Sequence, residues 1–408
     1  MKYILFKKLF IFVSALIMLP SALFAADFGF AVNFSGGYGN PAIEENKYDY
    51  KIDFLPRLSF LIGDNGEFSA LAGFTVGYEE YFYYVPEIMQ AELTMRLKGS
   101  GIIRLGRMGY SDPLSFIAEG LFDGAQFIYN SGAGSFRIGA WYTGFLYKKN
   151  INITMTENDL AGFNAVIDYD KFADTYFAPK RMFASIGWEH YSVGELVHLN
   201  TAIIGQYDLN DADKKYNSQY LIVKAGIPVS KFLFELGGCL ETLQKSDADK
   251  DEFDLAFAAE AGISLLFSGE RNSMLSFNGK IAGGKIEDTC DAFVPITVKY
   301  YGFVFKHKLS AISIFSLNYS SRLHDTAGVS LNMLYFIRND LGTVQGYPVT
   351  DNEGYFLGPE FSAQVIWSPA SDLQLNLRGG LFVPQLGDAG SQEKIMWRAE
   401  LSAAISLY

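Results

Sequence analysis

The chain has 408 residues and a formal net charge of −12, so it lacks the basic surface that nucleic-acid-binding proteins carry. Hydrophobic residues make up 49% of it, yet beyond residue 25 no apolar run is long enough for a membrane-spanning helix. Two cysteines are too few for a disulfide-based scaffold. Nucleic acid is therefore excluded as a partner.

Residues 1–25 have the organisation of a secretory signal peptide. Three lysines precede a short apolar stretch, Leu9–Leu19, and small residues follow it up to Ala25. The apolar stretch is short for a membrane anchor. We expect cleavage after Ala25, so that residues 26–408 form a single domain.

The segment 253–267 alternates strictly between two kinds of residue. Every second side chain from Phe253 to Phe267 is apolar, and those between are small or charged, with Leu266 as the exception. A strand points successive side chains to opposite faces, so this segment has one apolar face and one polar face. Similar segments of about ten residues, the length that a tilted strand needs to cross a bilayer, recur along the chain. The 35 Phe and 25 Tyr suit the aromatic girdles of such a protein.

Lipid tolerates no unpaired backbone, so spanning strands have to close on themselves. The predicted fold class is therefore all-β, a transmembrane antiparallel up-and-down β-barrel of the outer membrane. Short polar turns alternate with longer links, the asymmetry between periplasmic turns and extracellular loops. The short turns are expected at 63–66, 98–101, 131–134, 193–195, 228–230, 268–272 and 368–371.

The number of strands should be even, since both ends of the chain are expected on the periplasmic side. The count is ambiguous only between residues 294 and 338. We expect 294–301 to extend an outer loop or a long strand, 303–319 to descend as a strand, and 322–325 to form a turn. This gives about 18 strands, with 16 as the alternative.

The last predicted strand, 395–407, precedes the terminal residue Tyr408. A terminal aromatic residue resembles the signal that the barrel-assembly machinery recognises, although Tyr408 is out of phase with the apolar positions before it. The expected partners are therefore outer-membrane lipid, this machinery and small solutes.

Charged residues in the polar phase of the strands should face the lumen, because a charge facing hydrocarbon costs about 2–4 kcal/mol at the midplane. The arginines at 96, 104 and 137 lie on nearby strands and would attract anions or orient a carboxylated solute. Alternatively, such charges pair across strands and only fill a wet lumen. The predicted lumen residues are Glu92, Arg96, Arg104, Arg137, Arg181, Glu189, Lys224, Glu260, Lys280, Arg378 and Arg398.

The link 109–122 is unusually apolar for an exposed loop. It could fold into the barrel as a constriction that brings Asp112, Glu119 and Asp123 near the arginines. The alternative is an extracellular flap packed on the rim. The cysteines Cys239 and Cys290 could form a disulfide, since the cell envelope permits one.

Local motifs carry a resemblance to known barrels. The stretches Arg104–Met108, Asp112-Pro113 and Leu121–Ala125 are similar to the strand-loop-strand of alginate-export-like and substrate-selective porins, which are usually 18-stranded monomers. The strands, rich in Phe and Tyr and low in charge, also resemble those of spirochaete barrels. This resemblance implies a porin.

We expect an outer-membrane channel for small hydrophilic, anionic or carboxylated solutes, which needs no cofactor, no metal and no catalytic residues. A surface adhesin or structural barrel is a second hypothesis, and a transporter of hydrophobic solutes is a third. A pore needs a continuous wet lumen, and an adhesin a lumen plugged by side chains beneath large ordered loops. A carrier of hydrophobic solutes needs an apolar pocket and a lateral gap.

Overall fold

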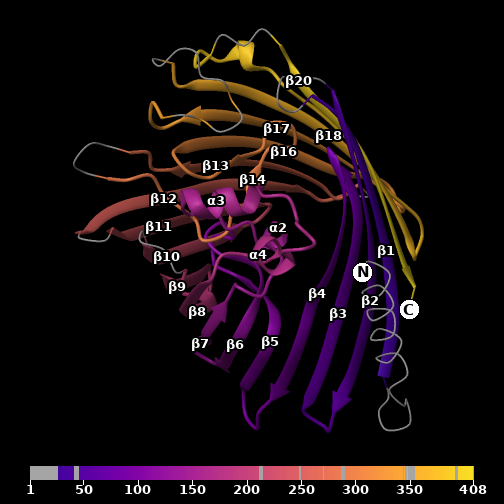
Figure 1. Ribbon diagram of the computed structural model, residues 1–408, viewed down its shortest axis with the longest axis vertical. Coiled ribbons are helices and arrows are strands. Elements are labelled where there is room, and N and C mark those ends of the chain that lie inside the picture. Colours follow the sequence, from indigo (N-terminus) through magenta and orange to yellow (C-terminus); the bar gives the residue numbers. More distant parts are fainter. Residues whose placement is uncertain are drawn as a thin grey trace.

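The computed structural model describes residues 26–40, 46–210, 215–247, 250–269, 271–285, 290–342, 344, 347, 354–390 and 394–407. The predicted signal peptide and Tyr408 lie outside the described residues. Eighteen antiparallel strands form one sheet in which each strand pairs with its neighbours along the chain, and β1 pairs with β20. The sheet is thereby a closed barrel (Figure 1), and the predicted fold class and the count of 18 are confirmed.

The barrel strands differ in length from 9 to 18 residues. In chain order they are β1 (Ala26–Gly39), β2 (Lys47–Ile62), β3 (Gly66–Glu79), β4 (Tyr81–Arg96), β5 (Gly101–Ser111), β6 (Glu119–Ser131), β7 (Gly134–Tyr142), β8 (Arg181–Val193), β9 (Val197–Asp208), β10 (Lys215–Val229), β11 (Phe232–Asp247), β12 (Lys250–Phe267), β13 (Ser273–Ala282), β16 (Ile312–His324), β17 (Ala327–Arg338), β18 (Phe356–Ala370), β19 (Leu373–Phe382) and β20 (Met396–Leu407).

Alternation along the strands separates a lipid-facing surface from the lumen, as the sequence predicts. On β12 the residues Phe253, Leu255 and Phe257 are exposed, whereas Ala256 and Ala258 between them are buried inside. Apolar side chains exposed in this way are stable only against hydrocarbon. The short turns are found between the predicted strands, on the same end of the barrel as the start of β1 and the end of β20.

Most links at the opposite end of the barrel are longer and carry the remaining elements, although β3 and β4 are joined there by Glu80 alone. Helices α2 (Lys148–Ile151), α3 (Glu157–Asn164) and α4 (Phe172–Tyr176) belong to the insert 143–180 between β7 and β8. The link between β13 and β16 contains the short strands β14 (Tyr300–Tyr301) and β15 (His307–Lys308), and η1 (Pro384–Leu386) follows β19. No helix in the described ranges is long and apolar enough to span a membrane.

One strand boundary differs from the prediction. The descending strand begins at Ile312, and residues 303–310 belong to the β13–β16 link instead. The apolar start of this segment is buried inside the barrel, since Phe303, Val304 and Phe305 are almost completely covered. Sequence alternation alone cannot distinguish a buried loop of this kind from the end of a strand.

The long links pack inside the barrel and form its main apolar core. Phe116 and Ile117 of the β5–β6 link, Ile151 and Ile153 of the insert, and six apolar residues of the β13–β16 link belong to one buried cluster, the last six being Phe293, Ile296, Phe303, Val304, Phe305 and Leu309. The helices of the insert appear within the outline of the barrel in Figure 1. The core that holds this protein together is therefore made of links packed against inward side chains of the strands.

Candidate functional site

Arg104 of β5 lies on the inner face and is held by residues of the two neighbouring strands. Its Nε donates to Glu92 Oε1 at 2.6 Å and its Nη2 donates to Glu92 Oε2 at 3.0 Å, which is a bidentate ion pair. A third bond, of 3.2 Å, joins Nη1 to Gln126 Oε1. The Arg104 side chain is 26% exposed against 8% for Glu92, so the cation faces the lumen and the carboxylate lies behind it.

Arg137 of β7 forms a second arginine–carboxylate pair, with Glu189 of β8. The same carboxylate also bonds the ring of His198 of β9, at 3.0 Å from Nε2. Arg137 is 40% exposed and Glu189 only 11%. As with Arg104, the guanidinium is the accessible member of the pair.

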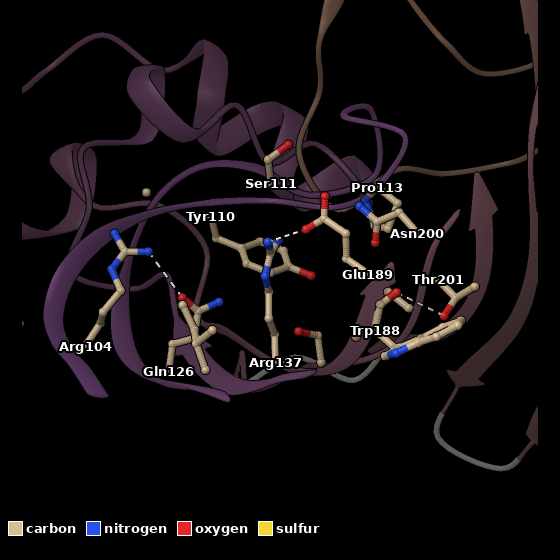
Figure 2. A pocket seen from close by; sticks show the side chains of 15 residues that line it. Arg104, Tyr110, Ser111, Pro113, Gln126, Arg137, Trp188, Glu189, Asn200 and Thr201 are labelled. Atoms are coloured by element: carbon tan, nitrogen blue, oxygen red, sulfur yellow. Dashed lines mark hydrogen bonds and ion pairs between the residues drawn. The ribbon is translucent and has the colours of Figure 1, made fainter. Parts of the chain in front are cut away.

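These two arginines line one pocket of about 340 Å³ on the inner face of β5 to β9. Figure 2 shows Arg137 beside Tyr110 and joined to Glu189, with Arg104 further to the left and joined to Gln126. The pocket wall also contains Gln126, Ser185, Asn200 and Thr201, which offer neutral hydrogen-bonding groups. The lining thus carries two cations and one carboxylate, because Glu92 is not part of it. Such a surface can bind an anion and hydrogen-bond its polar substituents.

The 112–118 link covers one side of this pocket and crosses the lumen, so the inward interpretation fits the structure. Pro113 lines the pocket, and a Cβ placed on Gly237 of β11 would collide with Leu114. Lys280 of β13 lies 5.1 Å from the centre of the Phe116 ring. The loop therefore rests on strands β11 to β13, away from the strands that carry it.

The acidic residues of this link do not oppose the arginines as predicted. Asp112 is buried and accepts from the backbone N–H groups of its own loop, at 2.8 Å from Leu114 and 2.9 Å from Ile117 and Ala118. Burial raises the pKa of Asp112, and these hydrogen bonds oppose that shift. Asp112 therefore shapes the loop and is not available to a solute.

Glu119 and Asp123 also correct the prediction. Glu119 pairs with Lys299 at 2.8 Å, in a contact between the start of β6 and the β13–β16 link. Asp123 is in β6, three positions from the inward Gln126, and its pair with Arg107 at 2.8 Å lies on the other face of the wall. Strand alternation explains this result, because residues separated by an odd number point to opposite faces.

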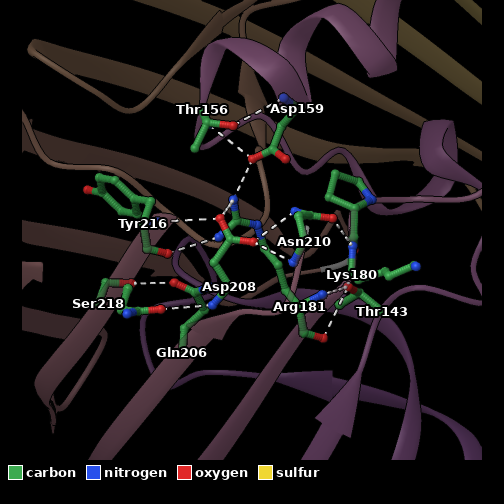
Figure 3. Close-up of polar contacts among 12 residues, drawn as sticks. Thr143, Thr156, Asp159, Lys180, Arg181, Gln206, Asp208, Asn210, Tyr216 and Ser218 are labelled. Atoms are coloured by element: carbon green, nitrogen blue, oxygen red, sulfur yellow. Dashed lines mark hydrogen bonds and ion pairs between the residues drawn. The ribbon is translucent and has the colours of Figure 1, made fainter. Parts of the chain in front are cut away.

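Arg181 is a predicted lumen residue that no solute can reach. It is completely buried, and its Nη2 donates to Asp159 of α3 at 2.6 Å and to Asp208 of β9 at 3.1 Å. Figure 3 shows this ion cluster between the insert and the wall. The inward phase was predicted correctly, but the insert covers the side chain, so its assignment to the solute path is wrong.

A second group of inward charges is balanced. Lys224 Nζ lies 3.0 Å from Glu260 Oε1 and 3.3 Å from Glu235 Oε1, and Lys280 pairs with Glu260. Two lysines and two glutamates on β10 to β13 thus neutralise one another beneath the 112–118 loop. Here the hypothesis that inward charges pair across strands describes the arrangement well.

The remaining predicted residues lie apart from the pocket. Arg398 of β20 makes two bonds to Asp49 of β2, 2.7 and 2.8 Å long, across the intervening β1. Arg378 stacks on Phe303 at 4.2 Å. Arg96 is exposed near the short turn that follows β4. The predicted row of three arginines is therefore reduced to Arg104 and Arg137 at the pocket.

Sequence reasoning missed the inward carboxylates that hold the loops. Glu360 of β18 accepts from the N–H groups of Phe303 at 2.6 Å, Val304 at 2.9 Å and Phe305 at 2.8 Å. Glu241 of β11 accepts from Val294 N at 2.9 Å. Both sit in the inward phase of their strands, so alternation could have identified them, but not their partners. Cys239 and Cys290 are both free thiols.

Comparison with known proteins identifies the fold. No family model and no curated protein sequence matches the chain. OccK2 (OpdF) of Pseudomonas aeruginosa in complex with glucuronate is 12% identical, with 94% of this chain and 98% of that chain covered and a TM-score of 0.62. OpdK of the same organism with vanillate is 9% identical over 93% and 98%, with a TM-score of 0.61. OccK11 (OpdR), also from Pseudomonas aeruginosa, is 11% identical over 94% and 96%, with a TM-score of 0.60.

These likenesses show that the chain has the same barrel fold as the OccK proteins. They confirm the expected 18-stranded barrel, and they lend no support to the alginate-export-like or spirochaete resemblance. At such low sequence identity, these similarities are evidence for the fold only.

Proposed function

We propose that this protein is an outer-membrane channel for small hydrophilic solutes that carry a carboxylate or another anionic group. The observation that carries the proposal is the pocket at β5–β9, where Arg104 and Arg137 are more exposed than the carboxylates that hold them. The anionic group of a solute that passes along this wall would lose part of its hydration and contact one guanidinium group after the other. Rings of charged side chains in other channels act on ions in this way. The solute path runs beside the loops.

The comparisons support the same solute class. OccK2 was solved with glucuronate and OpdK with vanillate, and both ligands are carboxylates. The neutral polar side chains of the pocket, such as Gln126 and Thr201, can form hydrogen bonds with hydroxyl groups on such a solute. Passive or selective diffusion requires no catalysis, and we assign the protein no enzymatic role. Loops also pack in the lumen, as the adhesin hypothesis requires, so the experiment below tests that hypothesis as well.

The test is single-channel conductance of the refolded mature chain in a planar bilayer, with the reversal potential measured in a potassium chloride gradient. We expect steps with anion preference in the wild type. Arg104→Ala with Arg137→Ala should shift the reversal potential toward cations, because Glu189 then dominates the pocket. Glu92→Gln with Glu189→Gln should shift it in the opposite direction.

The matched control is Arg322→Ala, which removes an exposed arginine far from the pocket at the β16–β17 turn and should leave selectivity unchanged. Heat-modifiable migration on a gel reports folding of each variant. A folded barrel that conducts nothing would overturn the channel and favour the adhesin. If neither double variant changes the ion selectivity, the pocket does not determine the selectivity of the channel, and its proposed role is overturned.

A further inference from the structure

The wall of the barrel is incomplete as a hydrogen-bonded sheet between β4 and β5. Pairing of these strands runs only from Ala91↔Arg107 to Arg96↔Ile102, six residue pairs, whereas β11 and β12 share sixteen. The first ten residues of β4, 81–90, pair with β3 on one side but with no strand of the described barrel on the other. In Figure 1 β4 and β5 diverge toward the end that carries α2 and α4.

Side chains replace the missing strand partner along this edge of β4. Tyr84 N donates to Tyr169 Oη at 3.0 Å, and that hydroxyl donates to Tyr84 O at 3.2 Å. Two residues on, Pro86 has no N–H, and its carbonyl accepts from Tyr176 Oη at 2.7 Å. The carbonyl of Ile88 accepts from Arg107. In lipid each of these backbone groups would otherwise remain unpaired at high cost.

The insert also supplies the packing at this seam, which we define as the contact of 81–90 with the insert. Tyr83, Tyr147, Tyr169, Phe172 and Tyr176 surround Val85 in a cluster separate from the main core. On the outer surface Ile88 is 57% exposed and Phe145 of the insert is 61% exposed, beside the outward Tyr142. The seam thus has apolar side chains on the lipid side, where the Arg107–Asp123 pair also bonds the carbonyls of Ile88 and Phe145, and it is tyrosine-rich within.

The seam borders the candidate pocket. Gly109, Tyr110 and Ser111, the part of β5 that has lost its β4 partner, are also residues that line the pocket. Separating the insert from 81–90 would break a few side-chain bonds and no strand pairing, while Ile151 and Ile153 keep the rest of the insert in the main core. Everywhere else around the described barrel, opening the wall between neighbouring strands would break at least eight residue pairs.

We propose that the β4–β5 seam is a lateral portal that connects the pocket with the outer leaflet of the membrane. The solute that uses it is an amphipathic carboxylate. Its head group binds Arg104 and Arg137, and its apolar part passes between the tyrosines of the seam. The choice of head group rests on the proposed function. The portal itself rests on the interrupted ladder and goes beyond that function.

The experiment closes and reopens the seam in one protein. Tyr84→Cys and Tyr169→Cys, whose rings stack at 4.4 Å, are introduced in a Cys239→Ala, Cys290→Ser background and joined by a short reducible bis-thiosulfonate. The protein is reconstituted in phospholipid vesicles that contain a palmitate with a diazirine on its chain. After illumination, mass spectrometry measures the labelled fraction of the peptide that contains Tyr110.

We expect labelling of Tyr110 when the linker is reduced, and a loss of that labelling when the linker is intact. The matched control joins Leu240→Cys to Phe257→Cys, a directly paired position of β11 and β12, and should change nothing. Equal labelling of Tyr110 with the seam closed and open would mean that the acid enters along the barrel axis, and would overturn the portal. So would labelling confined to lipid-facing residues such as Ile88 in both states.

A second variant keeps the proposal testable if the double-cysteine protein does not fold. Tyr169→Phe removes only the hydroxyl that makes two hydrogen bonds to Tyr84, and should raise labelling of Tyr110 at least about fivefold, the factor expected for the loss of a single hydrogen bond from the closed state. Unchanged labelling in this variant counts against the portal. Chloride selectivity, measured on the same preparations, should not depend on the linker, so failure of the portal is distinguishable from failure of the channel.

Discussion

Two regions of this barrel, the β5–β9 pocket and the loop-bearing end, carry similar inward charges with different consequences. On β5 to β8 no loop rests on Arg104 and Arg137, and both guanidinium groups reach the pocket. At the loop-bearing end, Arg181, Glu241 and Glu360 have the same inward phase but are buried under links that they hold. An inward charge therefore serves a solute only where no loop covers it, and elsewhere it serves as an anchor.

This difference has an energetic cause. A buried ion pair gains little over apolar packing, but removal of one partner leaves a buried charge that is costly. Exposed charges lose much less when a partner is removed, because water replaces it. The comparison thus predicts large structural effects for the anchors and functional effects for the pocket arginines.

The largest expected effect is that of Arg181→Ala. It leaves Asp159 and Asp208 buried without their cation, which should cost about 3–5 kcal/mol of the free energy that holds the insert on the wall. Hydrogen exchange of the insert amides in detergent micelles would measure this loss. Arg104→Ala is the control, and its effect on the same amides should be small. Equal effects of the two substitutions would contradict the distinction between anchors and pocket residues.

Glu360→Ala should destabilise the 302–308 loop by about 3 kcal/mol, because three buried N–H groups lose their acceptor. Glu360→Gln keeps the shape of the side chain but not its charge, so its effect should be intermediate. Exchange rates of the amides of Phe303, Val304 and Phe305 provide the measurement. If Glu235→Ala, at a partly exposed carboxylate, loosened the same amides equally, the anchoring role of Glu360 would be refuted.

The sequence was a good guide to strand phase and a poor guide to loop placement. Alternation with period two placed Arg104, Arg137, Lys224, Glu260 and Lys280 inside, since a charge facing lipid would be expelled. It could not show that Glu119 meets Thr297, because residues 178 positions apart leave no local pattern. The burial of Arg181 and of residues 303–305 depends on such contacts, and both were therefore assigned incorrectly.

The third prediction concerns pH. Burial lowers the pKa of His307, in the loop strand β15, to about 4 from an ordinary value near 6.5. The folded loop thus favours the neutral ring, whose Nδ1 bonds the carbonyl of Lys308 at 2.6 Å. The stability that the neutral ring provides is complete above pH 6.5 and is lost as the pH falls from there toward 4.

Between pH 6.5 and 5 this loss should reach about 2 kcal/mol, at 1.36 kcal/mol per pH unit. Hydrogen exchange of the 302–308 amides as a function of pH would measure it, and His307→Asn should flatten the profile. The exposed His324 offers the control, since His324→Asn should leave the profile as it is. A loop that is equally stable at both pH values in the wild type would contradict the prediction.

The smallest effect tests the contact that brings the 112–118 loop across the lumen. Gly237→Ala places a methyl group against Leu114 and should cost about 1–2 kcal/mol unless the loop tip moves away. Because the loop tip borders the pocket, such a movement should change single-channel conductance more than stability. Gly238→Ala is a closely matched control. It adds the same methyl group one residue on, at the opposite face, where the nearest atom is 4.0 Å away, and should alter neither quantity. If both variants conduct like the wild type, the loop does not limit the solute path, and the narrow part of the channel lies between the pocket arginines themselves.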